Sequence, residues 1–109
     1  MSRAKGNIAE ERASVYLKEQ GFEILERNFY TKFGEIDIIT YKEETFHFVE
    51  VKSGEDYEKA IQNMTPRKIG RILRSVDVYI KKNGLDSDYC IDAVIVTPNE
   101  ITLLENITL

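Results

Sequence analysis

Four residues in the middle of the chain have the types and the spacing for metal-assisted phosphodiester chemistry. They are Glu35, Asp37, Glu50 and Lys52. Side chains repeat every second residue along a strand, so each of the two pairs projects from one face if its segment is a strand. Mg²⁺ and Mn²⁺ prefer oxygen ligands, and Mg²⁺ binds one or two carboxylates plus water and substrate phosphate. The pattern indicates metal binding by the acids, with Lys52 orienting or deprotonating water or stabilising charge on phosphorus.

The segments that carry these residues favour a β-hairpin. Residues 34–42 and 45–52 are rich in β-branched and aromatic side chains, which is typical of strands. Only two glutamates separate them, so we expect a two-residue turn, and Asp37 then pairs with Glu50 and Glu35 with Lys52. Carboxylates paired in this way repel, because their Cβ atoms lie about 5 Å apart. A cation between them is therefore expected, although a two-residue slip would place them diagonally.

The same alternation sorts the remaining hairpin residues. One face carries the four polar residues with Ile39, Tyr41, Phe46 and Phe48. The other carries Ile36, Ile38, Thr40, His47, Val49 and Val51. A solvent-facing strand surface is the simple alternative for Glu50 and Lys52 taken alone, and Asp37 in register with them favours the functional interpretation.

Composition bounds the fold and the chemistry. The 109 residues, 42% of them hydrophobic, suffice for one domain over residues 1–109. No apolar run approaches the roughly 20 residues that span a bilayer, so we expect a cytoplasmic protein that does not contact membranes. Cys90 is the only cysteine and His47 the only histidine. An intramolecular disulfide is therefore impossible, and Cys-His or Ser-His-Asp catalysis is poorly supported.

A predicted N-terminal helix brings a third acid. Residues 3–20 place Gly6, Ala9, Ala13, Tyr16 and Leu17 on one face. Glu10 borders this packing face. It either reaches the Asp37 and Glu50 site, or extends into solvent and favours the positive end of the helix.

A second helix is predicted from Thr65-Pro66 to Lys82, with Thr65 as N-cap and Asn83-Gly84 at the end. Its expected buried stripe is Ile69, Ile72, Leu73, Val76, Tyr79 and Ile80. Its basic residues include Arg67, Lys68, Arg71 and Arg74. They form either a solvated face or a ridge that binds nucleic-acid phosphates, with Lys68 leaning toward the sheet. The net charge of −4 argues mildly against strong non-specific binding.

The remaining segments complete a mixed sheet. Residues 22–30 predict a first strand that makes an antiparallel meander with the hairpin. Residues 89–97 predict a buried strand parallel to residues 45–52, and residues 101–104 a short edge strand. We expect residues 53–64 to be a mobile loop with at most a helical turn, placed to grip substrate.

The order of these elements resembles the core of the PD-(D/E)xK nucleases, a restriction-endonuclease-like α/β (α+β) fold with αβββαβ topology. The motifs also resemble the YraN family of small endonuclease-like proteins over nearly the whole chain. These motifs are Gly6-x-x-Ala9-Glu10-x-x-Ala13-x-x-Tyr16-Leu17, Arg27-Asn28, Gly34-Glu35-Ile36-Asp37, Phe48-Val49-Glu50-Val51-Lys52, Thr65-Pro66-x-Lys68 and Glu105-Asn106.

More distantly, the chain is similar to archaeal Holliday-junction resolvases, which act as homodimers on branched DNA. The resemblance implies a Mg²⁺- or Mn²⁺-dependent endonuclease that acts on DNA rather than RNA. It implies that Asp37, Glu50 and the Val51 carbonyl bind the metal and that Glu10 assists through water. Lys52 then lies beside the attacking water.

Two other classes of function remain open. A catalytically inactive nucleic-acid-binding module would use the helix with Arg67, Arg71 and Arg74 and would ignore metal. A protein-interaction domain fits the acidic net charge and would not bind DNA even at low salt.

Overall fold

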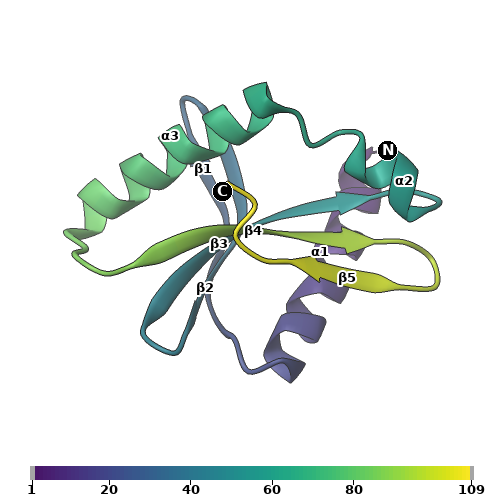
Figure 1. The fold of residues 1–109 in the computed structure, drawn as a ribbon, viewed down its shortest axis with the longest axis horizontal. Helices are drawn as coiled ribbons and strands as arrows, with labels where there is room; N and C mark the ends of the chain where they lie inside the picture. Colours follow the sequence, from purple (N-terminus) through teal and green to yellow (C-terminus); the bar gives the residue numbers. More distant parts are fainter. Residues whose placement is uncertain (1, 109) are drawn as a thin grey trace.

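A five-stranded mixed sheet with helices on both faces forms the centre of the molecule (Figure 1). The computed structural model describes residues 2–108, and side chains from residue 7, so the predicted place of Gly6 lies outside them. The elements in chain order are α1 (Ser2–Glu19), β1 (Glu23–Thr31), β2 (Gly34–Lys42), β3 (Thr45–Ser53), α2 (Tyr57–Ile61), α3 (Pro66–Asn83), β4 (Tyr89–Val96) and β5 (Ile101–Leu104). The strand order is β1-β2-β3-β4-β5, with β3 and β4 parallel and the other pairs antiparallel. This arrangement confirms the predicted α+β class with a mixed sheet and the predicted order of the strands.

The β2–β3 hairpin has the predicted two-residue turn. Its pairing begins at Lys42 with Thr45 and continues to Ile38 with Val49. Asp37 and Glu50 therefore lie one residue beyond the last pair. Glu43 and Glu44 have φ angles of 50° and 65°, the left-handed conformation that a tight hairpin requires and that glutamate adopts at a cost.

Helix α3 carries the chain from β3 to the parallel strand β4. The Thr65 hydroxyl accepts a hydrogen bond from the Lys68 N–H at 3.2 Å, and Gly84 ends the helix with a φ of 60°. Both ends were predicted from these residues. The prediction that Leu73 is buried is wrong, because this residue is 39% exposed.

The two long helices pack on opposite faces of the sheet (Figure 1). Helix α1 buries Ala9, Ala13 and Leu17 in a hydrophobic cluster with Ile38 and Val49. Helix α3 contributes to a second cluster that contains Ile72, Val76, Tyr79, Ile39 and Phe48. The hairpin alternation therefore sorts most apolar side chains as predicted.

Strand β2 breaks this alternation at Asp37. Ile36 and Ile38 were predicted to share a face, but Ile36 packs in the α3 cluster and Ile38 in the α1 cluster. On β1, Arg27 pairs with Ile38 and Phe29 with Ile36, which leaves Asn28 beside the break with a φ of 55°. Asparagine tolerates this conformation better than most residues. The predicted face assignment fails at this point.

The segment after β3 contains the short helical turn that the prediction allowed, and residues 57–61 form it as helix α2. The Asp56 carboxylate caps this helix by accepting a hydrogen bond from the Lys59 N–H at 2.8 Å. Ala60 is fully buried against Ala93 and Ile95 of β4. A Cβ atom added to Gly54 would lie 3.2 Å from the Ala60 nitrogen, so the close packing of this helix favours glycine. None of the helices within residues 2–108 has the length and apolar character needed to cross a membrane.

Candidate metal site

Asp37 lies at the centre of a group of acids at the end of the β2–β3 pairing. Its residue is only 8% exposed, and its Oδ2 accepts a hydrogen bond from the Val51 N–H at 2.8 Å. Because this donor belongs to the neighbouring strand, the sheet backbone itself fixes the orientation of the carboxylate. The Val51 backbone thus contacts Asp37 through its N–H, while the role predicted for its carbonyl stays a prediction.

Helix α1 and strand β2 each supply a carboxylate oxygen close to Asp37. One carboxylate oxygen from each of Glu10, Glu35 and Asp37 lies within 4.8 Å of the other two. Glu10 therefore turns toward the sheet, as its functional interpretation predicted. Carboxylate oxygens at this separation are suitable ligands for one hard divalent ion.

Asn28 bridges two of these acids. Its Nδ2 donates to Glu10 Oε1 at 2.8 Å and to Glu35 Oε2 at 2.7 Å. Only the amide NH₂ group can donate to two carboxylates, so the surroundings fix the orientation of this side chain. Arg27 lies at the edge of the group, with Nη2 3.8 Å from Glu10 Oε1 and Nη1 2.9 Å from Glu11 Oε1.

Glu50 and Lys52 extend the site along β3. Lys52 Nζ lies 3.0 Å from Glu50 Oε2, and the two side chains are 20% and 14% exposed. The partly buried ammonium is therefore held beside the acids. We call Glu10, Glu35, Asp37 and Glu50 the acidic cluster.

Burial and negative neighbours raise the pKa of Asp37. Desolvation is the largest cause, followed by the charge of Glu50, and together with Glu10 and a hydrogen bond with Glu50 they raise the pKa from 3.8 to about 9. The Val51 N–H opposes the shift, because it stabilises the charged carboxylate. In the absence of a cation, a proton is therefore held on this group at neutral pH.

A pocket of about 220 Å³ opens beside the acidic cluster. Its lining includes Asp37 and Glu50 on one side and Lys68 and Arg71 of α3 on the other. Lys68 thus leans toward the sheet as predicted.

Two of the predicted basic residues lie outside this pocket lining. Arg67 and Arg74 are exposed, and the Arg74 guanidinium stands 6.0 Å from the centre of the Phe33 ring. Two of the four basic residues, Lys68 and Arg71, therefore line the pocket beside the acids, and Arg67 and Arg74 do not.

Sequence reasoning gave Arg27 and Asn28 no role in the site, and it placed Glu35 on the polar face without predicting its contact with Asn28. All three stand in short motifs that carried the family resemblance, Arg27-Asn28 and Gly34-Glu35-Ile36-Asp37. Their contacts depend on the packing of α1 against β1 and β2, which no spacing within one strand reveals. Asn28 in particular is a neutral residue that becomes part of the site only because two acids converge on it.

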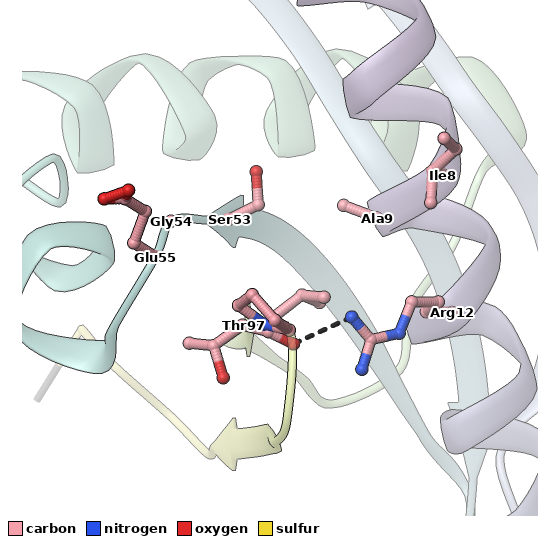
Figure 2. A pocket seen from close by; sticks show the side chains of 9 residues that line it. Ile8, Ala9, Arg12, Ser53, Gly54, Glu55 and Thr97 are labelled. Atoms are coloured by element: carbon pink, nitrogen blue, oxygen red, sulfur yellow. Dashed lines mark hydrogen bonds between the residues drawn. The ribbon is translucent and has the colours of Figure 1, made fainter.

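A second pocket, of about 180 Å³, lies between α1 and the ends of β3 and β4 (Figure 2). Arg12 closes one side by donating from Nη1 to the Thr97 carbonyl at 2.8 Å. The lining includes Ile8, Ser53 and Gly54 but none of the predicted catalytic residues. The acidic cluster is therefore the better candidate for chemistry.

The site and the fold together define the class of protein. The chain is an α+β domain in which a mixed sheet and the first helix bring four carboxylates together beside a lysine. This fold is compatible with the nuclease-like core that the sequence resembles.

Comparison with known proteins places the chain in a family. Residues 9–96 match the model of a family described as "Uncharacterised protein family UPF0102", and the chain belongs to this family. It is 62% identical over 109 residues to a UPF0102 protein of Sulfurimonas denitrificans and 54% identical over 110 residues to one of Aliarcobacter butzleri, with all of each chain covered. A UPF0102 protein of Helicobacter hepaticus is 50% identical over 108 residues, which cover 99% of this chain and 97% of the relative.

Proposed function

We propose that this protein is a metal-dependent endonuclease of the PD-(D/E)xK type that hydrolyses phosphodiester bonds in DNA. One observation carries the proposal: a buried aspartate is surrounded by three other acids and lies next to a lysine and a pocket with a basic wall. Folding alone does not favour four carboxylates at one point. A divalent ion and a phosphate substrate give this arrangement a function.

The donor set fits Mg²⁺ or Mn²⁺. All candidate ligands are oxygen atoms, and the cluster of Glu10, Glu35 and Asp37 contains no thiol or imidazole. Asp37 and Glu50 are proposed to hold the ion, with the Val51 carbonyl, and Glu10 to assist through water. When bound, the ion supplies positive charge that polarises the phosphate and favours ionisation of water.

The chain's own residues have separate roles in this proposal. Lys52, 3.0 Å from Glu50, donates a hydrogen bond to the attacking water or to a phosphate oxygen and stabilises the negative charge that develops there. Lys68 and Arg71, across the pocket from the acids, bind the phosphates on either side of the scissile bond. Asn28 holds Glu10 and Glu35 in fixed positions through its two hydrogen bonds.

Asp37 links the proposed activity to pH. Because its pKa is raised to about 9, metal binding must displace a proton, and metal affinity should therefore increase with pH. A nuclease of this type is expected to be more active at alkaline pH when the metal is not saturating.

The substrate and assembly follow from the resemblance alone. We propose branched DNA as the substrate class, DNA rather than RNA as the nucleic acid, and a cytoplasmic homodimer as the working form.

The test is cleavage of a labelled four-way junction and of the matching linear duplex in Mn²⁺ and in Mg²⁺. We expect the wild type to cleave, with activity lost in Glu50→Gln. The matched control is Glu11→Gln, because Glu11 is one residue from Glu10 and contacts Arg27 but has a 65% exposed side chain. This control should cleave at the wild-type rate.

Three outcomes would overturn the proposal. Equal cleavage by the wild type and Glu50→Gln would point to a contaminating nuclease or another site. Metal-independent binding of the junction without cleavage would favour the inactive binding module, which would rely on Arg67, Arg71 and Arg74 of α3. Absence of DNA binding even at low salt would favour a protein-interaction domain.

A further inference from the structure

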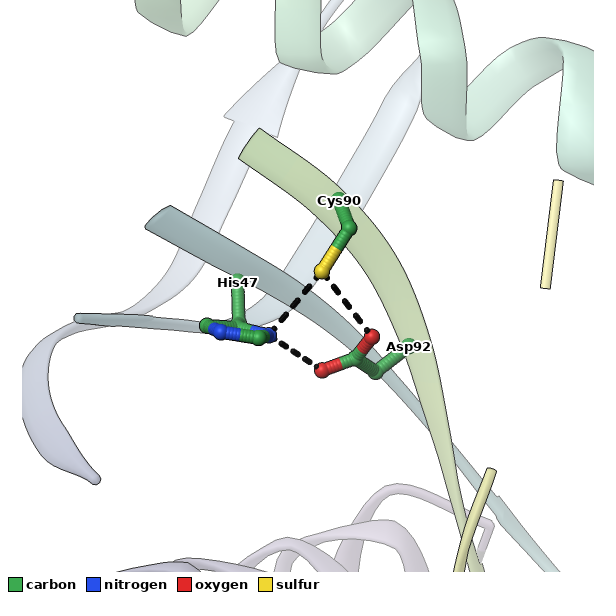
Figure 3. Close-up of side chains that lie close together, drawn as sticks. All are labelled: His47, Cys90 and Asp92. Carbon is green, nitrogen blue, oxygen red and sulfur yellow. Dashed lines mark hydrogen bonds and ion pairs between the residues drawn. The ribbon is translucent and has the colours of Figure 1, made fainter. Parts of the chain in front are cut away.

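A second polar cluster lies on the sheet, formed by the only histidine and the only cysteine together with a buried aspartate (Figure 3). His47 on β3 and Cys90 on β4 are partners in the parallel pairing, and Asp92 follows two residues later. His47 Nδ1 lies 2.7 Å from Asp92 Oδ2 and 3.0 Å from Cys90 Sγ, and Cys90 Sγ lies 3.4 Å from Asp92 Oδ1. We call these residues the His–Cys–Asp cluster.

The cluster offers one nitrogen, one sulfur and one oxygen ligand, all within 4.8 Å of one another. A tetrahedral Zn²⁺ ion with ordinary bond lengths holds such ligand atoms about 3.3–3.6 Å apart. The His47 nitrogen lies 3.0 Å from the Cys90 sulfur and 2.7 Å from Asp92 Oδ2, so each of these two separations must grow by less than about 1 Å. The 3.4 Å contact of the sulfur is to the other carboxylate oxygen, Asp92 Oδ1. The three side chains are thus already close to a ligating arrangement.

We propose that His47, Cys90 and Asp92 form a site for a thiophilic divalent ion of the Zn²⁺ type, distinct from the acidic cluster. Thiolate and imidazole ligands select Zn²⁺ over the hard ions that carboxylates prefer. Glu105 or water completes the coordination. Glu105 is exposed at the surface and directly precedes Asn106, whose N–H donates to Asp92.

Surrounding residues hold two of the ligands in place. The Asn106 N–H donates to Asp92 Oδ1 at 2.9 Å, and Asp92 is fully buried. The Phe22 ring packs edge-on against the His47 ring, with centroids 5.0 Å apart. Such outer contacts orient metal ligands and reduce the freedom lost on binding.

This site is separate from the acidic cluster in space and in chemistry. His47 precedes Glu50 by three residues on β3, which places it about 10 Å away along the strand and on the other face. Its neighbour Phe22 belongs to the cluster packed against α1. The proposal therefore does not depend on nuclease activity.

Metal binding at this site must displace a proton. Burial, the Asp92 carboxylate and Glu105 raise the pKa of the Cys90 thiol to about 12, so the thiol is protonated at neutral pH in the metal-free protein. When the metal–sulfur bond forms, the S–H bond breaks and the proton passes to solvent. Each bound ion should therefore release a proton.

Cobalt(II) is the best probe, because a thiolate bound to Co²⁺ gives an intense near-ultraviolet charge-transfer band and carboxylate ligands do not. We expect the reduced full-length protein to develop this band with one equivalent of Co²⁺ and to lose it when Zn²⁺ is added. Cys90 is the only cysteine, so the band reports this site alone. Absence of a band at saturating Co²⁺ would overturn the proposal.

Variants assign the other ligands. His47→Gln and Asp92→Asn should weaken Co²⁺ binding by more than the roughly 10- to 100-fold that loss of an outer contact costs. Asp37→Asn, in the acidic cluster, should leave the band unchanged. A band of wild-type affinity in both His47→Gln and Asp92→Asn would show that sulfur binds the ion without them and would refute the site.

Folding of the variants is checked separately. Cys90→Ser is nearly isosteric, and a native circular dichroism spectrum would show that it folds. Zn²⁺ should raise the Tm of the wild type more than that of Cys90→Ser. An equal shift in the two proteins would assign the bound Zn²⁺ to another site and would contradict the proposal.

Discussion

Two buried aspartates in one sheet have opposite surroundings. Asp37 accepts one backbone hydrogen bond and otherwise faces acids, whereas Asp92 accepts hydrogen bonds from the Asn106 N–H and the Cys90 thiol and contacts His47. Both residues are at most 8% exposed. Their difference therefore comes from their neighbours and not from the depth of burial.

The comparison teaches how buried charge reveals function. A buried carboxylate that is fully hydrogen-bonded contributes to a stable structure, while one that faces like charges destabilises the fold until a proton or a cation neutralises it. The acidic cluster thus lowers the stability of the fold, and this cost makes it a candidate for a functional site. The His–Cys–Asp cluster combines stability with ligands for a different ion.

The largest effect is expected from a substitution in the acidic cluster. Asp37→Asn should lower kcat/KM for cleavage of junction DNA by about a thousandfold, because the amide removes a charged ligand. The same variant should be more stable by about 1–2 kcal/mol at neutral pH, because the amide can still accept from the Val51 N–H and, unlike the carboxylate, does not have to take up a proton on folding. Cleavage assays and thermal unfolding of one preparation measure both effects.

Loss of activity with a marked loss of stability in Asp37→Asn would contradict this picture, because it would mean that Asp37 supports the fold. Glu11→Gln, exposed on α1, is the control and should alter neither quantity.

The second prediction concerns Asp92. Asp92→Ala should lower the free energy of unfolding by about 3 kcal/mol, because it leaves the Asn106 N–H and His47 without their acceptor in a buried position. Asp92→Asn keeps an acceptor and should cost less. Chemical denaturation of the metal-free proteins measures both values, and a neutral effect of Asp92→Ala would remove the contrast between the two aspartates.

The third prediction is a pH dependence of stability. The pKa of Asp37 is about 9 in the folded protein and 3.8 as the model value, so the folded state binds the proton more tightly. Stability from this group is complete below the unfolded value and decreases as the pH rises toward 9, by at most about 1.4 kcal/mol per pH unit. Asp37→Asn should reduce this slope, and so should saturating Mg²⁺. A wild-type slope that survives in Asp37→Asn would assign the titration to another group.

The smallest effect is expected at Asn28. Asn28→Gly keeps the positive φ angle but removes both hydrogen bonds to Glu10 and Glu35, and it should lower stability by about 1 kcal/mol. Because Mg²⁺ neutralises the same acids, the loss should shrink when Mg²⁺ is present. Thermal unfolding with and without Mg²⁺ tests this, and an unchanged loss would mean that Asn28 does not act through the acids.

Much of the fold was predictable because it depends on local patterns. The two-residue turn after Lys42, the Thr65 N-cap and the Gly84 C-cap each follow from residues next to one another in sequence. The parallel pairing of β3 with β4 was also predicted, since a long helix between two strands favours it. Helix α2 was allowed for only as a helical turn without a position, because five residues leave almost no periodic signal and its stability comes from burial of Ala60.

The sites were harder to predict because they depend on packing between elements. Asp37, Glu50 and Lys52 were visible as alternating residues on adjacent strands, and Glu10 as an acid at the edge of a packing face. The contacts of Asn28 and Glu35 could not be predicted without knowing how α1 packs against β1. They also depend on the break in alternation at Asp37, which a strictly periodic strand does not have. His47 was correctly placed away from Glu50, but its contact with Cys90 spans 43 residues.

The parallel pairing of β3 and β4 has a consequence for the order of folding. It joins residues 43 apart in the chain, and closing so long a loop is slow relative to forming the β2–β3 hairpin. The hairpin and α1 can bring Asp37 and Glu10 together before β4 docks, whereas His47 and Cys90 meet only afterwards. Reactivity of Cys90 during refolding would therefore report the last step, in which the second half of the sheet joins the first.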